Sequence, residues 1–209
     1  MTIEIIGAGQ VGGALGRILV ARGEQVHFGV PDPVKYALLA EELGSRARIG
    51  TVPTAVAAAT EIVILATPYV AAAQALRSIS DWGRRILIDA TNPIAPGLAG
   101  LSVGTSSSGA EELARHATHA RVVKAFNTTG FENMANPVYP QGRIFMPVCG
   151  DDADARSKVV ALAISLGFDG VDAGPLAAAR YLEPFAMTWI HLAYRQGFGR
   201  NFAFGIIRR

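Results

Sequence analysis

A short glycine-rich run near the start of the chain, GAGQVG at residues 7–12, carries the most recognisable chemistry in this sequence. Glycines with this spacing allow a tight turn, a close approach of the backbone to a diphosphate and close packing of a helix on a strand. The run follows a predicted strand (residues 2–6) and opens a predicted helix (residues 10–22), whose first N–H groups favour an anion. The alternative is a glycine-rich turn that binds no nucleotide. We predict a dinucleotide site formed by Gly7, Gly9, Gln10, Val11 and Gly12.

The end of a second predicted strand (residues 25–29) bears on the choice between NAD and NADP. An acidic residue there binds the ribose 2′-hydroxyl of NAD, whereas a basic residue favours the 2′-phosphate of NADP. Asp32 lies about 20 residues past the glycines, but it also stands directly before a proline, which is typical of a helix start. We favour that second interpretation. With Gly29 and Val30 at the strand end and Lys35 within reach of a phosphate, the sequence predicts NADP, with NAD as the alternative.

Three more predicted strands (residues 61–66, 85–89 and 121–125) end in polar or turn-forming residues. The carboxyl ends of parallel strands meet at one edge of a sheet, where ligands of such folds bind. Taken singly, Thr67 and Asn92 could simply form turns before a proline. Taken together, the strand ends predict a cleft for the nicotinamide, lined by Ala66, Thr67, Pro68, Asn92, Ala125 and Asn127.

Charged residues outside this edge give two further expectations. An unpaired buried ammonium is costly, so Lys124 in an apolar strand should pair with Asp89 or with a cofactor phosphate. Arg180 and Glu183 stand three apart and could form a pair on a helix surface. No catalytic residue and no metal site is predicted, because the serines at 106–108 have no recognisable base and the histidines lack metal-ligand spacing. Hydride transfer between two bound cofactors needs no protein nucleophile, only stacked rings about 3–3.5 Å apart in a site without water.

The arrangement of elements predicts the fold class. Short apolar runs alternate with segments of helical period, which is typical of a Rossmann-type, doubly wound α/β fold with a mostly parallel sheet. Later strands (143–149 and 168–172), a helix (151–166) and a helical segment (176–196) interrupted by Pro184 predict a small C-terminal α/β extension. Two long loops are predicted, at 92–107 and 130–142, and a capping box at 108–111 starts another helix. We expect one domain over 1–209, with a Rossmann core at about 1–125 and an extension at about 126–209 that completes the cleft.

Composition excludes several classes of function. The net charge is only +2, with no run of basic residues, so no nucleic-acid partner is expected. A single cysteine, Cys149, excludes an internal disulfide and lies in an apolar run that predicts a buried strand. The most apolar late stretch, residues 185–194, is about half the length that spans a bilayer. With no targeting segment recognised, we expect no membrane association and a cytoplasmic location.

Taken over nearly its whole length, the chain resembles the NADPH-dependent reductases of coenzyme F420, an 8-hydroxy-5-deazaflavin, and is similar to the cytosolic reductase domain of the STEAP metalloreductases. The resemblance rests on GAGQVG, ATP at 66–68, DATNP at 89–93, VVKAFNT at 122–128, CGDD at 149–152, DAGPL at 172–176 and the ARYLEP segment. It implies a homodimer that binds NADP along the first strands and a flavin or deazaflavin (F420) against the C-terminal part. It also implies that Gly9, Gln10 and Val11 hold the pyrophosphate, that Thr67 and Pro68 lie near the nicotinamide ribose, and that Asn127 lies near the ring.

One position departs from the family pattern. Members usually have an arginine for the 2′-phosphate two residues after the glycine of the second strand, where this chain has Pro31, and Lys35 replaces it only as a point charge. The leading hypothesis is therefore an NADP(H)-dependent oxidoreductase with a flavin-like or deazaflavin acceptor. The alternatives are an imine or keto reductase resembling pyrroline-5-carboxylate reductase, and a sensor that binds NADP(H) without turnover.

Overall fold

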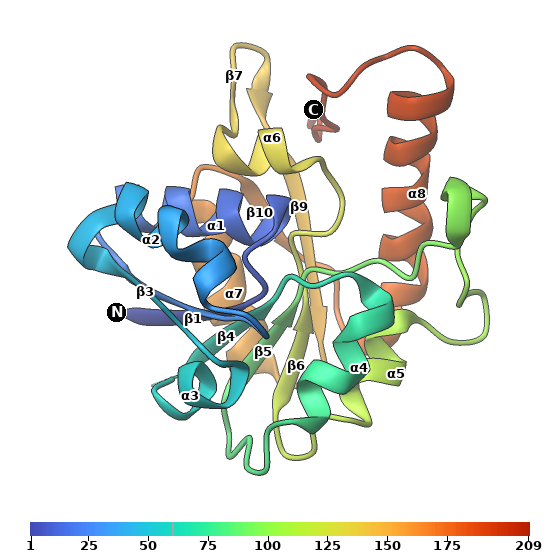
Figure 1. Cartoon of the computed structure of the whole chain (residues 1–209). Helices are drawn as coiled ribbons and strands as arrows, with labels where there is room; N and C mark the ends of the chain where they lie inside the picture. Colours follow the sequence, from blue (N-terminus) through green and yellow to red (C-terminus); the bar gives the residue numbers. More distant parts are fainter. Residues whose placement is uncertain (60) are drawn as a thin grey trace.

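The computed structural model describes residues 1–59 and 61–209 of the chain. An eight-stranded sheet forms its centre, in the order β10-β9-β6-β5-β4-β1-β2-β3 (Figure 1). The strands are β1 (Thr2–Ile6), β2 (Gln25–Gly29), β3 (Ala47–Gly50), β4 (Ile62–Leu65), β5 (Ile86–Asp89), β6 (Arg121–Lys124), β9 (Phe145–Gly150) and β10 (Asp169–Asp172). The first six strands are parallel to one another and follow the order of a Rossmann sheet, which confirms the predicted fold class.

Helices cover both faces of the sheet. Their bounds are α1 (Gln10–Ala21), α2 (Ala37–Leu43), α3 (Val52–Ala57), α4 (Tyr69–Arg77), α5 (Gly109–Ala114), α6 (Phe131–Ala135), α7 (Ala153–Ser165) and α8 (Ala179–Arg195), with short 3-10 turns at Val34–Tyr36, Gly44–Arg46, Pro96–Leu98 and Leu176–Ala178. Buried side chains of α1, α6 and α7 share one apolar core, and those of α3, α4, α5 and α8 share the other. This is the layering of a doubly wound fold, in which the helices on the two sides of the switch point cover opposite faces of the sheet.

The two faces follow from the alternation of side chains along each strand. In β1, Ile3 and Ile5 belong to the first core and Ile6 to the second, and all three are fully buried. A strand buried on both sides reads as an almost continuous apolar run, which is why β4 and β5 could be predicted from sequence. The order of the strands changes direction between β1 and β4, which are parallel neighbours, so the switch point of the sheet lies between them. The carboxyl ends of β1, β2, β4, β5 and β6 therefore meet along one edge.

The C-terminal part adds two strands, β9 and β10, beside β6, and both run antiparallel to the first six strands. β9 pairs with β6 in antiparallel register, and β10 runs parallel to β9. Residues 130–142 were predicted to form a long loop, which is wrong. They contain α6 and a small hairpin of β7 (Val138–Tyr139) and β8 (Gly142–Arg143). The helix is only five residues long and is held by packing of Met134 into the first core rather than by its own propensity.

The last helix also differs from the prediction. Pro184 was expected to interrupt it, but α8 continues from Ala179 to Arg195 with the proline inside. Proline removes one backbone hydrogen bond in a helix, and buried residues on both sides of it, Leu182 and Ala186, hold the helix to the rest of the chain. Among the described residues, no helix is long and apolar enough to cross a membrane.

Candidate functional site

The turn between β1 and α1 has the geometry that its glycines predict. Gly7 has a φ of +103°, a conformation that disfavours other residues, and its N–H donates to the carbonyl of Gly29 at 2.9 Å. A Cβ on Gly12 would lie 2.1 Å from the Gly7 oxygen, so only glycine lets the helix start this close to the strand. Gly9 differs from both, because a Cβ there would have nothing within 4 Å. The chain thus leaves open space beside Gly9.

The start of α1 fits an anion. Gly9 is its N-cap, with no side-chain hydrogen bond, and the first turn contains no acidic residue. The first N–H groups of any helix have no partner within it, so in α1 those of Gln10, Val11 and Gly12 are left for another acceptor. Gly9 and Gln10 are also exposed. An uncapped helix start beside an open hollow is the arrangement that binds the diphosphate of a dinucleotide.

The end of β2 is closed by backbone contacts. Val30 is buried, and its N–H donates to the carbonyl of Gly50. The carboxylate of Asp32 accepts a hydrogen bond from the N–H of Val34 at 3.1 Å, at the entry to the 3-10 turn, as the helix-start interpretation expects. Lys35 is exposed, and its ammonium lies 5.5 Å from the centre of the Tyr36 ring. Lys35 is therefore available to a phosphate beyond the strand end.

The ends of β4, β5 and β6 place two asparagines in contact. The Nδ2 atom of Asn127 donates to Oδ1 of Asn92 at 3.0 Å, and Nδ2 of Asn92 donates to the backbone oxygen of Asn127 at 2.8 Å. Ala66, Thr67 and Pro68 lie at the same edge of the sheet after β4. The buried atoms Oγ1 of Thr67 and Oδ1 of Asn127 have no hydrogen-bond partner among the described residues. Unpaired buried polar atoms are rare in folded proteins, so their presence here indicates a site for a polar ligand.

A buried charge network lies behind this edge. Lys124 donates to Asp89 at 2.9 Å and to the carbonyl of Thr91 at 2.6 Å, and forms an ion pair with Glu183 at 3.0 Å. The three charged side chains are at most 1% exposed. Glu183 also accepts the N–H groups of Gly109 and Ala110 at the start of α5. Burial lowers the pKa of Lys124, but the two carboxylates raise it more, so its pKa lies above the usual range and the ammonium stays charged.

This network settles two sequence expectations. The Lys124–Asp89 pair is confirmed, and Glu183 is a third member that the sequence did not indicate. The predicted pair of Arg180 with Glu183 is wrong: Arg180 instead binds Glu111 through two hydrogen bonds of 2.9 and 2.6 Å. Glu183 faces the interior of the protein, whereas Arg180 lies nearer the surface. Because the two side chains point in different directions, their spacing of three residues does not bring them into contact. The network fixes α8 against the ends of β5 and β6.

Two side chains that could exchange protons, those of Tyr69 and Cys149, are occupied or inert. The phenol of Tyr69, directly after Pro68, donates to Glu112 at 2.8 Å, and burial together with that carboxylate raises its pKa. Burial raises the pKa of the Cys149 thiol to about 12, so it stays protonated. Among residues 1–59 and 61–209, no group of three potential ligands could hold a metal ion. Neither Tyr69 nor Cys149 is therefore poised to exchange a proton with a ligand.

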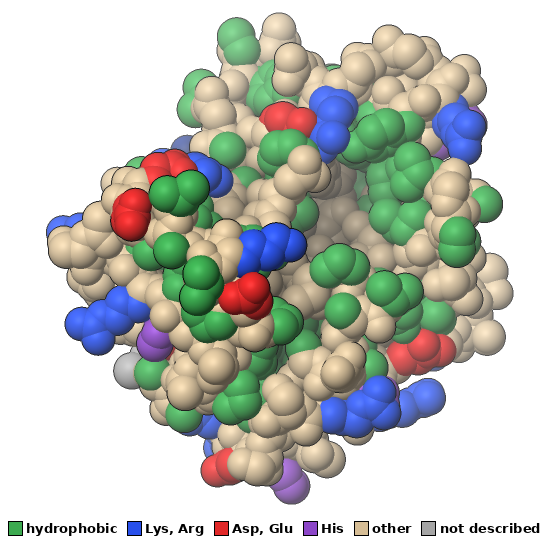
Figure 2. Space-filling view, in the orientation of Figure 1, with side chains coloured by type: hydrophobic (Ala, Val, Ile, Leu, Met, Phe, Trp, Pro, Cys, Tyr) green, Lys and Arg blue, Asp and Glu red, His purple; other side chains and the backbone are tan. Residues whose placement is uncertain are grey.

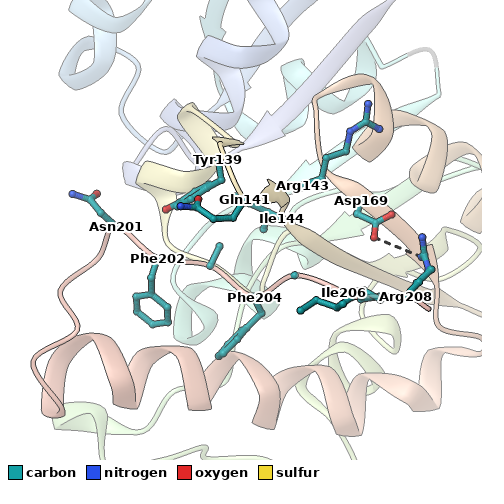
Figure 3. Close-up of a pocket in the computed structure, with 14 residues that line it drawn as sticks. Tyr139, Gln141, Arg143, Ile144, Asp169, Asn201, Phe202, Phe204, Ile206 and Arg208 are labelled. Carbon is teal, nitrogen blue, oxygen red and sulfur yellow. Dashed lines mark ion pairs between the residues drawn. The ribbon is translucent and has the colours of Figure 1, made fainter.

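Two hollows lie around α8 and the C-terminal tail. A groove of about 700 Å³ separates α8 from the loop after β5 and is lined by residues 98–105 together with Pro184, Met187, Thr188 and His191. A second cavity, of about 590 Å³, lies between the β7–β8 hairpin and the tail, and contains none of the predicted cofactor residues (Figure 3). In the space-filling view the molecule is hollowed beside α8, with hydrophobic side chains on the wall at that side (Figure 2). The groove along α8 also contains none of the predicted cofactor residues; Pro184, which lines it, lies two residues after Leu182, whose carbonyl oxygen contacts Asn127.

The sheet order and the glycine turn are those of Rossmann-type proteins that bind dinucleotides. The family model described as "NADP oxidoreductase coenzyme F420-dependent" matches residues 2–93. A structure of a hypothetical protein from Sinorhizobium meliloti is 32% identical, with a TM-score of 0.80, and the match covers 88% of this chain and 90% of that one. A protein from Arthrobacter sp. FB24, itself only proposed to be an F420-dependent NADP reductase, is 28% identical with a TM-score of 0.88 over 99% of both chains. Residues 2–93 of this chain thus match the model of the coenzyme F420-dependent NADP oxidoreductases, and the whole chain is similar in fold to these two solved structures.

A curated relative is longer than this chain. Metalloreductase STEAP3 of Rattus norvegicus is 30% identical over 183 residues, which is 87% of this chain and 35% of that protein. The chain therefore spans about a third of its relative's length. An imine reductase from Myxococcus stipitatus in complex with NADP+ has the same fold, with 20% identity, a TM-score of 0.63 and 61% of its length covered.

Proposed function

We propose that the protein transfers hydride between NADP(H), bound along the carboxyl edge of the sheet, and a flavin-like or deazaflavin acceptor bound against α8. The observation that carries the proposal is the uncapped start of α1 beside Gly9, where open space and free N–H groups fit a diphosphate. Bound NADP(H) supplies a nicotinamide that gives or takes a hydride. The family supports NADP over NAD, and Lys35 is the residue we assign to the 2′-phosphate.

The residues of the chain would divide the work by position. Gly9, Gln10 and Val11 hold the diphosphate through backbone N–H groups, and Thr67 and Pro68 line the nicotinamide ribose. With the diphosphate at β1, the nicotinamide reaches the ends of β5 and β6, where Asn92 and Asn127 meet. The fixed position of α8 would hold the other side of the site, and the chemistry there would be hydride transfer between the two bound rings.

The groove along α8 supports a ring-shaped acceptor. Its volume of about 700 Å³ lies within the range of small-molecule sites, about 300–1,000 Å³. One wall of the groove is formed by α8, the helix that also contacts Asn127 through the carbonyl oxygen of Leu182. Tyr69, Cys149 and Lys124 are each buried or bound to another group, so a carbonyl or imine substrate that needs a proton finds no poised donor among them. His191 does line the groove, so the preference for a deazaflavin acceptor over the imine or keto reductase alternative rests on the family model.

Stopped-flow absorbance tests the proposal directly. NADPH is mixed with the protein and with F420, FMN, a ferric chelate, or a ketone plus amine in parallel. We expect rapid loss of NADPH absorbance with F420 or FMN and little with the ketone and amine. Oxidation by the ketone and amine alone would establish the imine reductase alternative. Tight NADPH binding without oxidation by any acceptor would establish the sensor.

A further inference from the structure

The side-chain amide of Asn127 can be oriented without ambiguity. Its Nδ2 lies 3.0 Å from Oδ1 of Asn92 and 3.4 Å from the carbonyl oxygen of Leu182. Both neighbours are acceptors, because Asn92 uses its own Nδ2 to donate to the backbone of Asn127. A flipped amide would set oxygen against oxygen at both contacts, so the nitrogen must face them. The amide oxygen is on the other branch of the planar group and points away from both.

This oxygen is held in place at a cost. Asn127 is 4% exposed, and its Oδ1 has no partner among the described residues. The residue before it, Phe126, has a φ of +59°, a left-handed conformation that is strained for a bulky side chain. Phe126 is fully buried, its ring meets Phe168 edge-on at 5.9 Å, and its N–H contacts the sulfur of Met146. Packing therefore enforces a strained turn that presents an unpaired acceptor at the end of β6.

We propose that Oδ1 of Asn127 accepts a hydrogen bond from an amide-type N–H on a bound ring. The free atom is an acceptor and cannot donate, so its ligand must carry a donor. Two groups with this chemistry belong to the reaction proposed above, on which the inference rests: the carboxamide of the nicotinamide and the ring imide of a flavin or deazaflavin. Asn127 thereby distinguishes rings that carry an N–H donor from rings that lack one. The diphosphate turn supplies affinity that is common to all dinucleotides.

Paired ligands that differ only in the N–H test this role by calorimetry. The first pair is NADPH and its reduced 3-acetylpyridine analogue, in which a methyl group replaces the amide nitrogen. The second pair is FMN and its N3-methyl derivative. For the wild-type protein we expect that, in one of the two pairs, the ligand without the N–H binds about five- to tenfold more weakly. The pair that shows this difference identifies the ring that donates to Asn127. In Asn127→Ala that ratio should fall below about twofold.

A buried asparagine elsewhere gives a matched control. Asn133 uses its side chain fully, donating to Thr129 and Phe202 and accepting from Tyr139. Asn133→Ala should lower the melting temperature yet keep the wild-type ratios. Equal affinities within both pairs for the wild-type protein would overturn the proposal, and this comparison needs no variant. Ratios unchanged by Asn127→Ala would overturn it as well. A wild-type protein that binds no NADPH would instead refute the proposed function.

Discussion

Removing the Lys124 ammonium should destabilise the protein far more than breaking a surface ion pair. Lys124→Met keeps the apolar stem but removes the ammonium, which lies 2.9 Å from a carboxylate oxygen of Asp89 and 3.0 Å from one of Glu183. Both carboxylates stay buried. Truncating one partner of a buried ion pair costs about 3–5 kcal/mol, because the other charge stays uncompensated. For a chain of this size, about 2–4 °C of melting temperature corresponds to 1 kcal/mol. We therefore expect a loss of roughly 6–20 °C.

Thermal unfolding followed by circular dichroism measures this loss, with Arg180→Met as the matched control. Arg180 and Glu111 are both partly exposed, so their pair contributes at most about 1 kcal/mol. If Lys124→Met does not fold, Glu183→Gln keeps the shape of the side chain and should show a smaller loss of the same sign. A Lys124→Met protein that melts within about 3 °C of the wild type, or no lower than Arg180→Met, would refute the assigned energetics.

Three further outcomes are expected. Gly9→Glu should weaken NADPH binding by at least about 100-fold in calorimetry, because it puts a carboxylate at the diphosphate site. Its melting temperature should stay at the wild-type value, because a Cβ at this position has no atom within 4 Å. An unchanged affinity for NADPH would contradict the placement of the diphosphate. Pro31→Arg should raise the preference for NADPH over NADH, and an unchanged ratio of dissociation constants would contradict our position for the 2′-phosphate. Burial raises the pKa of Glu4 from 4.5 to about 7, so the folded state holds a proton that the unfolded chain loses, and stability falls as pH rises through that interval. Glu4→Gln should flatten this decline and melt higher at pH 8; an unaltered pH profile would show that Glu4 is not the cause.

Much of the cofactor side could be predicted because it depends on local backbone geometry. The spacing of Gly7, Gly9 and Gly12 after an apolar strand specifies the turn, and a buried strand such as β4 is visible as a continuous apolar run. Asp32 could be interpreted from its position before a proline, and the structure shows its hydrogen bond to Val34. The assignment of individual residues to NADP(H) stays a prediction, to be tested by the variants above.

The sequence by itself determined the fold class and the glycine turn after β1, because the strand and helix patterns and the glycine spacing each involve residues within a few positions of one another. Only the tertiary structure decided that Glu183 turns inward to Lys124 while Arg180 binds Glu111, since helical spacing allows either partner. It also decided that the Asn127 amide is locked with its oxygen unpaired. These contacts join residues 35 to 69 positions apart. Their energies depend on burial, which one stretch of sequence does not specify.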